Sequence, residues 1–324
     1  MCTAISFETN ASYFGRNLDL EYSYNEAVTV TPRSFMLNFR KTRPIKTHHA
    51  IIGMAHVVDN YPLYYDGMNE HGLAMAGLNF PNNAVYYDED PAKENIAPFE
   101  LIPYILGRFI TVDEVSQGLD GINILRLPFS DTLPLSPLHW IISDKNKSIT
   151  VEATSDGMRI YDNPIGVLTN NPPFNIMMHR LSDFRYLSAE PSSSRFLSAY
   201  EIPEYCAGVG AIGLPGDFSS VSRFVKAAFV KLNSVSYEDE EESVGQFFHL
   251  LSSVEMPNGS VRLKNGKYAA TVYSSCCSQD KGIYYYTTYG NRRINAVNMH
   301  SADLGASELS IFALNKKQSI NMQN

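Results

Sequence analysis

The sequence opens with MCTAI, which places the thiol of Cys2 directly after the initiator methionine. If Met1 is removed, Cys2 carries both a thiol and a free α-amine. An N-terminal amine can act as the base that activates a neighbouring hydroxyl or thiol, so no distant histidine is required. Free α-amines and thiols both titrate within about two units of neutral pH. The opening residues therefore predict an N-terminal nucleophile, although a cysteine can also stand second in a chain without any function.

A β-hairpin is predicted directly after this opening. Two short β-prone runs, ISF and SYF, flank the polar turn ETNA. Such a hairpin folds Arg16 and Asp19 back alongside Cys2, and a loop of three or five residues places Arg16 opposite Cys2, whereas a loop of four places Asn17 there. A nearby arginine favours a thiolate, and a carboxylate can hold an α-ammonium group or accept its hydrogen bond. The alternative is a surface ion pair, which would contribute little.

Seven blocks of sequence, spread over essentially the whole chain, carry a family resemblance. In chain order they are MCTA, GRNLDLEYSYNE (15–26), DGMNEHGLAMAGLNFP (66–81), LHWIISD (138–144), GVLTNNPPF (166–174), GLPGDFSSVSRF (213–224) and QFFHLLSSVE (246–255). Any single block could match by accident, but their order and spacing together are specific. The chain resembles the choloylglycine hydrolase family, which contains the conjugated bile salt hydrolases and the penicillin V acylases.

The resemblance implies an α+β fold, the four-layer αββα sandwich of N-terminal nucleophile hydrolases. The pattern of the chain agrees with this class, because many short strands alternate with two pairs of apolar helices. The helices are expected over residues 98–110, from 111 onward, over 219–232 and over 246–254, with Thr111 and the serines at 219–222 as caps. No repeat of fixed period and no low-complexity linker divides the 324 residues, so 1–324 is expected to be a single domain that loses Met1.

Four catalytic positions follow from the resemblance for the nucleophile and the groups around it. Cys2 is expected to attack the substrate, and its own amine to carry the proton to the leaving group. Asp19 is expected to orient that amine, while Arg16 and Arg223 stabilise the thiolate and organise the pocket. Arg223 falls in the first turn of a predicted helix, where a cation opposes the helix dipole. A cation placed against this local preference indicates a use elsewhere.

Two further positions are expected to form an oxyanion hole. By the resemblance, Asn79 contributes its backbone N–H; it ends a strand of small residues, although an asparagine there could simply mark the turn before Pro81. Asn170 directly follows another predicted strand, and a side-chain amide at a strand end can donate to a developing oxyanion. Asn171 is the alternative, but it precedes proline and is the more local, turn-forming residue.

The resemblance implies hydrolysis of the amide that links a steroid acyl group to glycine or taurine, through a thioester and without a metal or organic cofactor. A steroid needs a broad apolar wall, for which candidate loop residues are Leu20, Tyr24, Tyr65 and Leu138, although each could equally be ordinary packing. Two alternatives stay open: a penicillin V acylase with the same chemistry, and a non-enzymatic bile-salt-binding protein on the same scaffold. The sequence NFP at 79–81 favours the bile salt branch, and the presence of all six catalytic positions opposes the binding protein.

Composition and charge exclude several other classes. A formal net charge of −8 argues against a nucleic-acid partner. No apolar run approaches the roughly 20 residues that span a bilayer, and the N-terminus lacks a secretory pattern, so cytoplasmic location is expected. Adjacent His48 and His49 lie in a basic segment without a third ligand at suitable spacing, so a polar loop is expected and no metal site. A homotetramer is expected by family analogy alone.

Overall fold

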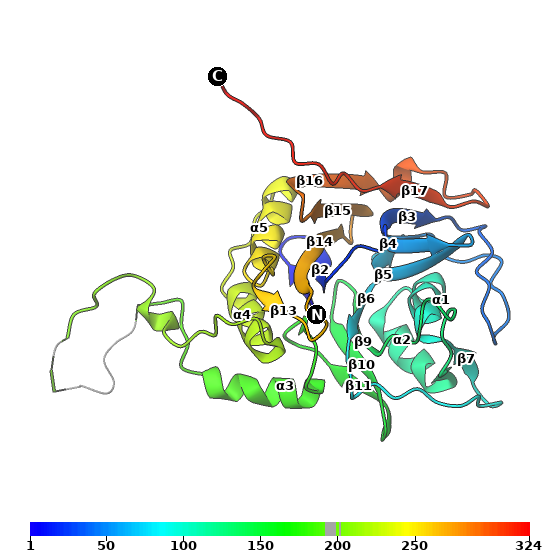
Figure 1. Cartoon of the computed structure of the whole chain (residues 1–324), viewed down its shortest axis with the longest axis horizontal. Coiled ribbons are helices and arrows are strands. Elements are labelled where there is room, and N and C mark those ends of the chain that lie inside the picture. The colour runs from blue at the N-terminus through cyan, green and yellow to red at the C-terminus, as the bar shows by residue number, and fades with distance from the viewer. Residues whose placement is uncertain (192–198, 201) are drawn as a thin grey trace.

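The computed structural model describes residues 1–191, 199, 200 and 202–324, and its centre is formed by two β-sheets that face each other (Figure 1). The seven-stranded sheet has the order β12 (Val167–Leu168), β1 (Cys2–Glu8), β2 (Ser12–Leu20), β14 (Tyr268–Ser278), β15 (Ile283–Thr288) and β16 (Asn291–Asn298), with β13 (Val261–Arg262) paired to β14. The eight-stranded sheet has the order β11 (Gly157–Asp162), β10 (Ser148–Thr154), β9 (Leu138–Ser143), β6 (Ala74–Asn79), β5 (Tyr61–Asn69), β4 (Ile51–Val58), β3 (Ala27–Thr31) and β17 (Ser310–Ala313). A separate parallel pair joins β7 (Glu94–Ile96) to β8 (Ile122–Ile124).

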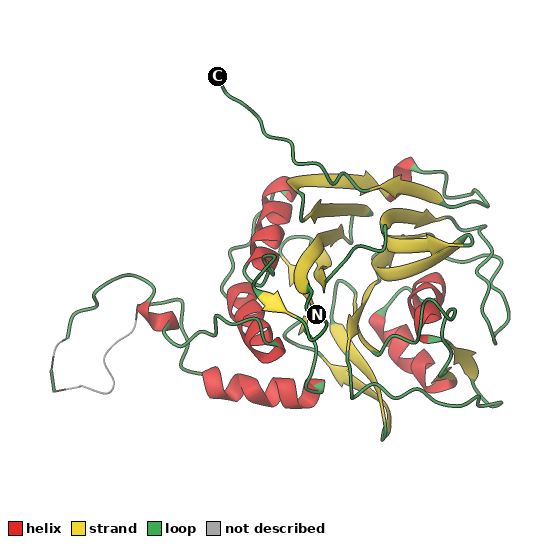
Figure 2. Cartoon of the chain, viewed as in Figure 1, coloured by secondary structure: helices red, strands yellow, loops and turns green. Residues whose placement is uncertain are grey.

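Helices cover the outer faces of both sheets (Figure 2). The described α-helices are α1 (Leu101–Arg108), α2 (Val112–Gly118), α3 (Phe174–Arg180), α4 (Ser220–Leu232) and α5 (Glu240–Ser252). Helix α1 packs on β5 and β6, while α4 and α5 pack on β1, β2, β12 and β14. The order helix, sheet, sheet, helix confirms the predicted αββα sandwich.

The inner strands β4, β6, β9 and β10 of the eight-stranded sheet are largely buried on both faces, whereas β11 and β17 are partly exposed. Along β9, His139 and Ile141 point to one side, whereas Trp140 and Ile142 join the core under α1. This alternation follows from the two-residue period of a strand, and burial on both faces explains why the run reads as continuously apolar. Consequently the core between the sheets, which contains Cys2, is separate from the core under α1.

Helix starts coincide with the predicted capping residues. Thr111 Oγ1 accepts the backbone N–H of Glu114 at 3.2 Å at the start of α2, and Ser219 Oγ accepts that of Ser222 at 3.3 Å at the start of α4. The acidic run after Tyr237 begins α5, so this helix starts earlier than predicted. Helix α3 was not predicted. Among the described residues, no helix has the length and apolar character needed to cross a membrane.

The N-terminal hairpin forms, but both predicted registers were wrong. Its loop has three residues between the paired Glu8 and Ser12, and Leu18 lies opposite Cys2, while Arg16 lies opposite Ala4. A shift of two residues leaves each side chain on its original face, because the strand period is two. Arg16 therefore still shares a face with Cys2, one pair further along the ladder.

Candidate active site

Cys2 begins β1 at the centre of the molecule and is 2% exposed. Its backbone N–H donates to Asn170 Oδ1 at 3.0 Å, and its carbonyl oxygen accepts from Arg223 Nη1. Met1 precedes it, and the Met1 α-ammonium donates to the carbonyl oxygen of Asp19 at 2.6 Å. Loss of Met1 would thus convert a nitrogen that already lies against Asn170 into a free amine.

Arg16 is completely buried behind Cys2. Its Nη1 donates to the carbonyl oxygens of Gly77 at 2.6 Å and Tyr65 at 3.1 Å, and its Nη2 has no hydrogen-bond partner among the described residues. Burial lowers the pKa of Arg16, but nearby acidic groups, Cys2 first among them, more than reverse this and raise it. Arg16 therefore stays charged, with one side of the guanidinium unengaged.

Asp19 lies at the end of β2 and is also completely buried. Its Oδ1 accepts from Thr271 Oγ1 at 2.6 Å, whereas its Oδ2 has no hydrogen-bond partner among the described residues. Burial raises the pKa of Asp19, against the opposing charges of Arg223 and the N-terminal ammonium. The carboxyl group thus holds a free acceptor position close to the start of the chain.

Asn170 connects three of the predicted positions. Its Oδ1 accepts from Cys2 N–H and, at 2.7 Å, from Arg223 Nη2, while its Nδ2 donates to the Asn79 carbonyl oxygen at 2.6 Å. Two donors fix which end of the amide is oxygen, so the amide nitrogen must face Asn79. Asn171 instead donates to the Pro81 carbonyl oxygen, away from Cys2. The structure therefore places Asn170, not Asn171, beside Cys2.

Together, the six predicted catalytic positions lie around the start of β1: Cys2, Arg16, Asp19, Asn79, Asn170 and Arg223. Thr3 belongs to the same network, because its Oγ1 accepts from Arg223 Nη1 at 2.7 Å. Neither Thr3 nor Thr271 was among the predicted positions. The signal that could have indicated them is a threonine at an inward-facing position of a predicted strand, where a buried hydroxyl needs a hydrogen-bond partner.

The four apolar candidates for a substrate wall lie in different surroundings. Leu20 and Tyr65 are half-buried against the same core as Cys2, while Leu138 packs against the core under α1. Tyr24 contacts Tyr22 through their hydroxyl groups at 2.7 Å. Their role as a wall stays a prediction.

A buried carboxylate under Arg16 was also missed. Asp66 on β5 accepts hydrogen bonds from the hydroxyls of Tyr284 at 2.6 Å and of Tyr273. Burial raises the pKa of Asp66, and the charge of Arg16 partly offsets this. Tyr284 belongs to the tyrosine-rich strand β15, so a hydroxyl of this strand completes the polar network between the sheets.

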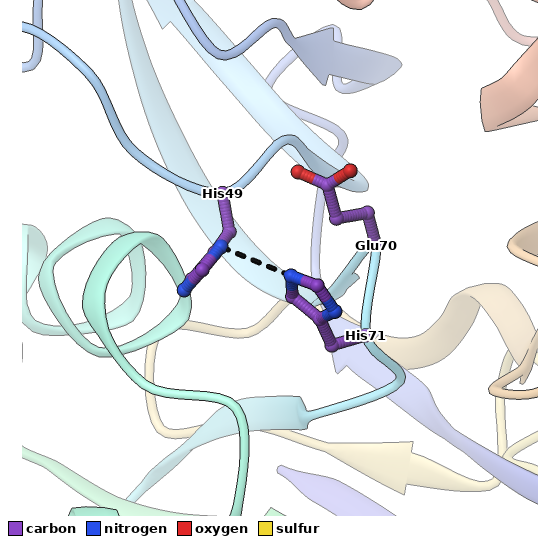
Figure 3. Close-up of side chains that lie close together, drawn as sticks. All are labelled: His49, Glu70 and His71. Carbon is purple, nitrogen blue, oxygen red and sulfur yellow. Dashed lines mark hydrogen bonds between the residues drawn. The ribbon is translucent and has the colours of Figure 1, made fainter.

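Away from Cys2, His49, Glu70 and His71 form a small cluster (Figure 3). His49 Nδ1 lies 3.1 Å from His71 Nε2, and the possible ligand atoms of all three residues lie within 4.8 Å of one another. Burial and the neighbouring His71 lower the pKa of His49. These neighbours were not predicted, because the turn after β5 brings Glu70 and His71 to His49 from a distant part of the chain.

The surroundings of this cluster oppose a bound cation. The carboxylate of Glu70 already accepts from Arg33 Nε at 2.9 Å and from the backbone N–H of Ala50 at 2.8 Å. Further cations line the same hollow, namely Arg43, Lys46 and Arg108. These positive side chains would repel a metal cation. We therefore interpret the cluster as a pair of histidines next to the Arg33–Glu70 ion pair.

The chain is similar to known proteins over almost its whole length. Residues 2–312 match the family described as linear amide C–N hydrolases, choloylglycine hydrolase family. A bile salt hydrolase/transferase of Lactiplantibacillus plantarum is 51% identical over 314 residues, covering 97% of both chains. A bile salt hydrolase/transferase of Clostridium perfringens is 39% identical over 329 residues, covering 100% of both.

Solved structures share the fold. A mutant conjugated bile acid hydrolase from Clostridium perfringens superposes with a TM-score of 0.92 at 39% identity, covering 100% of both chains. A penicillin V acylase from Agrobacterium tumefaciens superposes with a TM-score of 0.77 at 19% identity, covering 98% of this chain and 94% of that one, which shows likeness of fold alone. The chain belongs to the choloylglycine hydrolase family of linear amide C–N hydrolases.

Proposed function

We propose that this protein hydrolyses the amide bond of glycine- or taurine-conjugated bile salts, with Cys2 as the nucleophile. The observation that carries the proposal is the contact of the Cys2 nitrogen with Asn170, whose amide also reaches Asn79 and Arg223. One short network thus joins the attacking residue to both proposed oxyanion donors. The names and identities of the relatives support the substrate class.

In the first step, after removal of Met1, the sulfur of Cys2 attacks the amide carbonyl carbon and the carbonyl π electrons move to oxygen. The thiol proton passes to the Cys2 amine, directly or through water. The oxyanion accepts from the backbone N–H of Asn79 and from the second hydrogen of Asn170 Nδ2. Such preorganised donors stabilise charge that develops only in the transition state.

Collapse of this intermediate breaks the carbon–nitrogen bond. The Cys2 ammonium gives its proton to the leaving nitrogen, so glycine or taurine departs as an amine and the bile acyl group stays as a thioester. Water then attacks the thioester, the amine takes a proton from that water, and the Cys2 sulfur leaves and is reprotonated. The pocket returns to its starting state with no net change in its protons.

The charged residues around Cys2 support these steps without reacting. Arg16 and Arg223 favour the thiolate, because an adjacent cation stabilises the charged form of an acid. Asp19 offers its unpaired Oδ2 to the amine and so orients it. The apolar wall against the steroid is proposed to consist of Leu20, Tyr24, Tyr65 and Leu138. The proposed reaction uses no metal or organic cofactor.

Turnover of glycocholate, taurocholate and penicillin V by the same preparation tests the substrate class. We expect hydrolysis of at least one bile conjugate to exceed that of penicillin V, and a clear preference for penicillin V would overturn the assignment. Cys2→Ser tests the mechanism: bile salt binding, measured by calorimetry, should persist while cleavage disappears. Cleavage that survives in Cys2→Ser would refute the nucleophile.

The cellular setting is proposed by family analogy. We infer a cytoplasmic homotetramer that meets conjugated bile salts entering the cell. Light scattering coupled to size exclusion should give four times the 36.2 kDa mass of the chain, and a monomer would contradict this part of the proposal. Fractionation of the native host, with activity in the soluble cell extract, tests the location.

A further inference from the structure

Behind Asn79 and Asn170, the side chains of His139 and Glu152 form a pair that is completely buried. His139 lies on β9 and Glu152 on the neighbouring strand β10. The imidazole Nδ1 of His139 lies 3.0 Å from Glu152 Oε1, and its Nε2 lies 3.0 Å from the carbonyl oxygen of Thr169. Nothing in the mechanism above uses either side chain.

The partners of the ring determine how many protons it carries. A carbonyl oxygen only accepts, so Nε2 of His139 must donate to Thr169. Oε1 of Glu152 also accepts the backbone N–H of Phe174 at 3.0 Å, and this contact favours a carboxylate that receives a second donor from Nδ1. With Glu152 as a carboxylate, His139 satisfies both contacts as an imidazolium, and the two side chains then form a buried ion pair.

The ring contacts both chain segments that carry the proposed oxyanion donors. Phe80 follows Asn79 directly and stacks face to face on His139, with ring centroids 4.2 Å apart and an interplanar angle of 4°. Thr169, which accepts from His139, directly precedes Asn170. Strands β6 and β9 belong to one sheet and β12 to the other, so this hydrogen bond joins the two sheets at the site.

We propose that His139 and Glu152 are positioning residues that hold Asn79 and Asn170 in register as an oxyanion hole. The inference rests on the proposed function, which gives those two asparagines their role. Burying two charges costs about as much free energy as their attraction returns, so stability alone is a weak reason for such a pair. Precise orientation is a stronger one, because catalytic groups must be held to within about 0.5 Å.

Glu152→Gln is the sharpest test because it keeps the shape and removes the charge. Without the carboxylate, the imidazolium loses its counter-ion, so the ring becomes neutral and can no longer donate from both nitrogens. A neutral ring donates from one nitrogen only, so its hydrogen bond either to residue 152 or to Thr169 is lost, and the ring, no longer anchored on both sides, holds the segment before Asn170 less firmly. We expect kcat for glycocholate to fall about 10- to 100-fold, with KM changed less than about threefold.

A second readout separates positioning from general damage. The rate at which iodoacetamide alkylates Cys2 reports the nucleophile and needs no oxyanion hole. It should change less than about threefold in Glu152→Gln, because Arg16 and Arg223 are untouched. The matched control is Glu100→Gln, which neutralises a buried carboxylate held by the backbone N–H groups of Arg40 and Ala97, directly before α1. This control should lower thermal stability while leaving kcat within about twofold.

Phe80→Leu probes the same link from the other segment. It keeps an apolar side chain and removes the stacked contact, so kcat should fall about two- to tenfold with Cys2 alkylation unchanged. If Glu152→Gln does not fold, Phe80→Leu and an NMR spectrum of the wild-type protein still test the inference. In ¹⁵N-histidine NMR, both ring nitrogens of His139 should show a directly bonded proton.

Three results would overturn the inference. They are a wild-type His139 with one bare ring nitrogen, folded variants that keep kcat within twofold, and losses of kcat matched by equal losses of Cys2 alkylation. Failure of the proposed function is recognised separately, because the wild-type protein would then fail to cleave glycocholate or would prefer penicillin V, or Cys2→Ser would still cleave the substrate. If Cys2→Ser is inactive and Glu152→Gln is fully active, only the positioning role falls.

Discussion

The α-ammonium nitrogen of Met1 lies 2.6 Å from the backbone carbonyl oxygen of Asp19. The positive N-terminal ammonium group next to Asp19 therefore belongs to Met1, and the nitrogen of Cys2 is part of a peptide bond. An amide nitrogen shares its lone pair with the carbonyl and cannot accept a proton. Removal of Met1, as proposed, would unite the attacking thiol and the base in one residue.

Retention of Met1 is expected to suppress turnover. Loss of a general base typically costs 10²- to 10⁴-fold, so a Met1-bearing preparation should be at least about 100-fold slower than the processed enzyme. Intact mass gives the processed fraction of each preparation, and the initial rate should rise in proportion to it. Equal rates from fully retained and fully processed chains would show that the Cys2 amine is not the proton carrier.

The two adjacent asparagines should respond differently to truncation. Asn170→Ala removes a proposed oxyanion donor and should lower kcat by about 100-fold or more. Asn171→Ala removes only the hydrogen bond to the Pro81 carbonyl, so it should cost about 1 kcal/mol of stability and leave kcat within about threefold. Initial rates and thermal unfolding of both variants decide the matter, and a larger loss of kcat in Asn171→Ala would reverse the assignment.

The acid side of the pH profile should depend on Asp19. Burial raises the pKa of Asp19, so its carboxylate is protonated at a higher pH than that of an exposed aspartate. Activity that needs this carboxylate is present above the folded-state pKa and is lost as the pH falls through it. Asp19→Asn should lower kcat/KM and lack that acid limb, whereas Asp113→Asn, at an exposed carboxylate, should keep it. An unchanged limb in Asp19→Asn would exclude the role.

Lys231 should make the free energy of unfolding depend on pH. Burial lowers its pKa to about 8, and its Nζ donates to the Ile165 carbonyl oxygen at 2.6 Å. Between about pH 8 and the ordinary lysine value of about 10.4, the unfolded chain binds a proton that the folded protein has released. The contribution of Lys231 to the free energy of unfolding therefore becomes more stabilising as the pH rises through this window.

Lys231→Gln keeps a donor for Ile165 but cannot titrate. Urea titrations of both proteins at pH 7, 8, 9 and 10 should show the stability of the wild type rising relative to the variant above pH 8. Below pH 8 the difference between the two should be constant. A difference that is flat over the whole range would mean that Lys231 has its ordinary pKa in the folded protein.

Local sequence was sufficient for much of the fold. The caps Thr111 and Ser219 were predicted correctly because a cap depends only on residues within one helical turn. The hairpin after Cys2 was also predicted, but its register was not, because register depends on loop conformation and on the pairing of β2 with β14. The order of short strands and apolar helices along the chain was sufficient to predict the α+β fold class, because the hydrophobic pattern of each element follows from which of its faces is buried.

The six predicted catalytic positions came from motifs whose spacing resembles a family, and the structure brings them together from four separate parts of the chain. The sequence alone determined that a thiol stands second, that asparagines lie at or just after the ends of two predicted strands, and that the chain carries the family's blocks. Only the tertiary structure decided that Leu18 faces Cys2, that Asn170 rather than Asn171 turns toward it, and that His139 meets Glu152. These contacts join residues far apart in the chain, and their geometry depends on how two sheets pack, which no local pattern encodes.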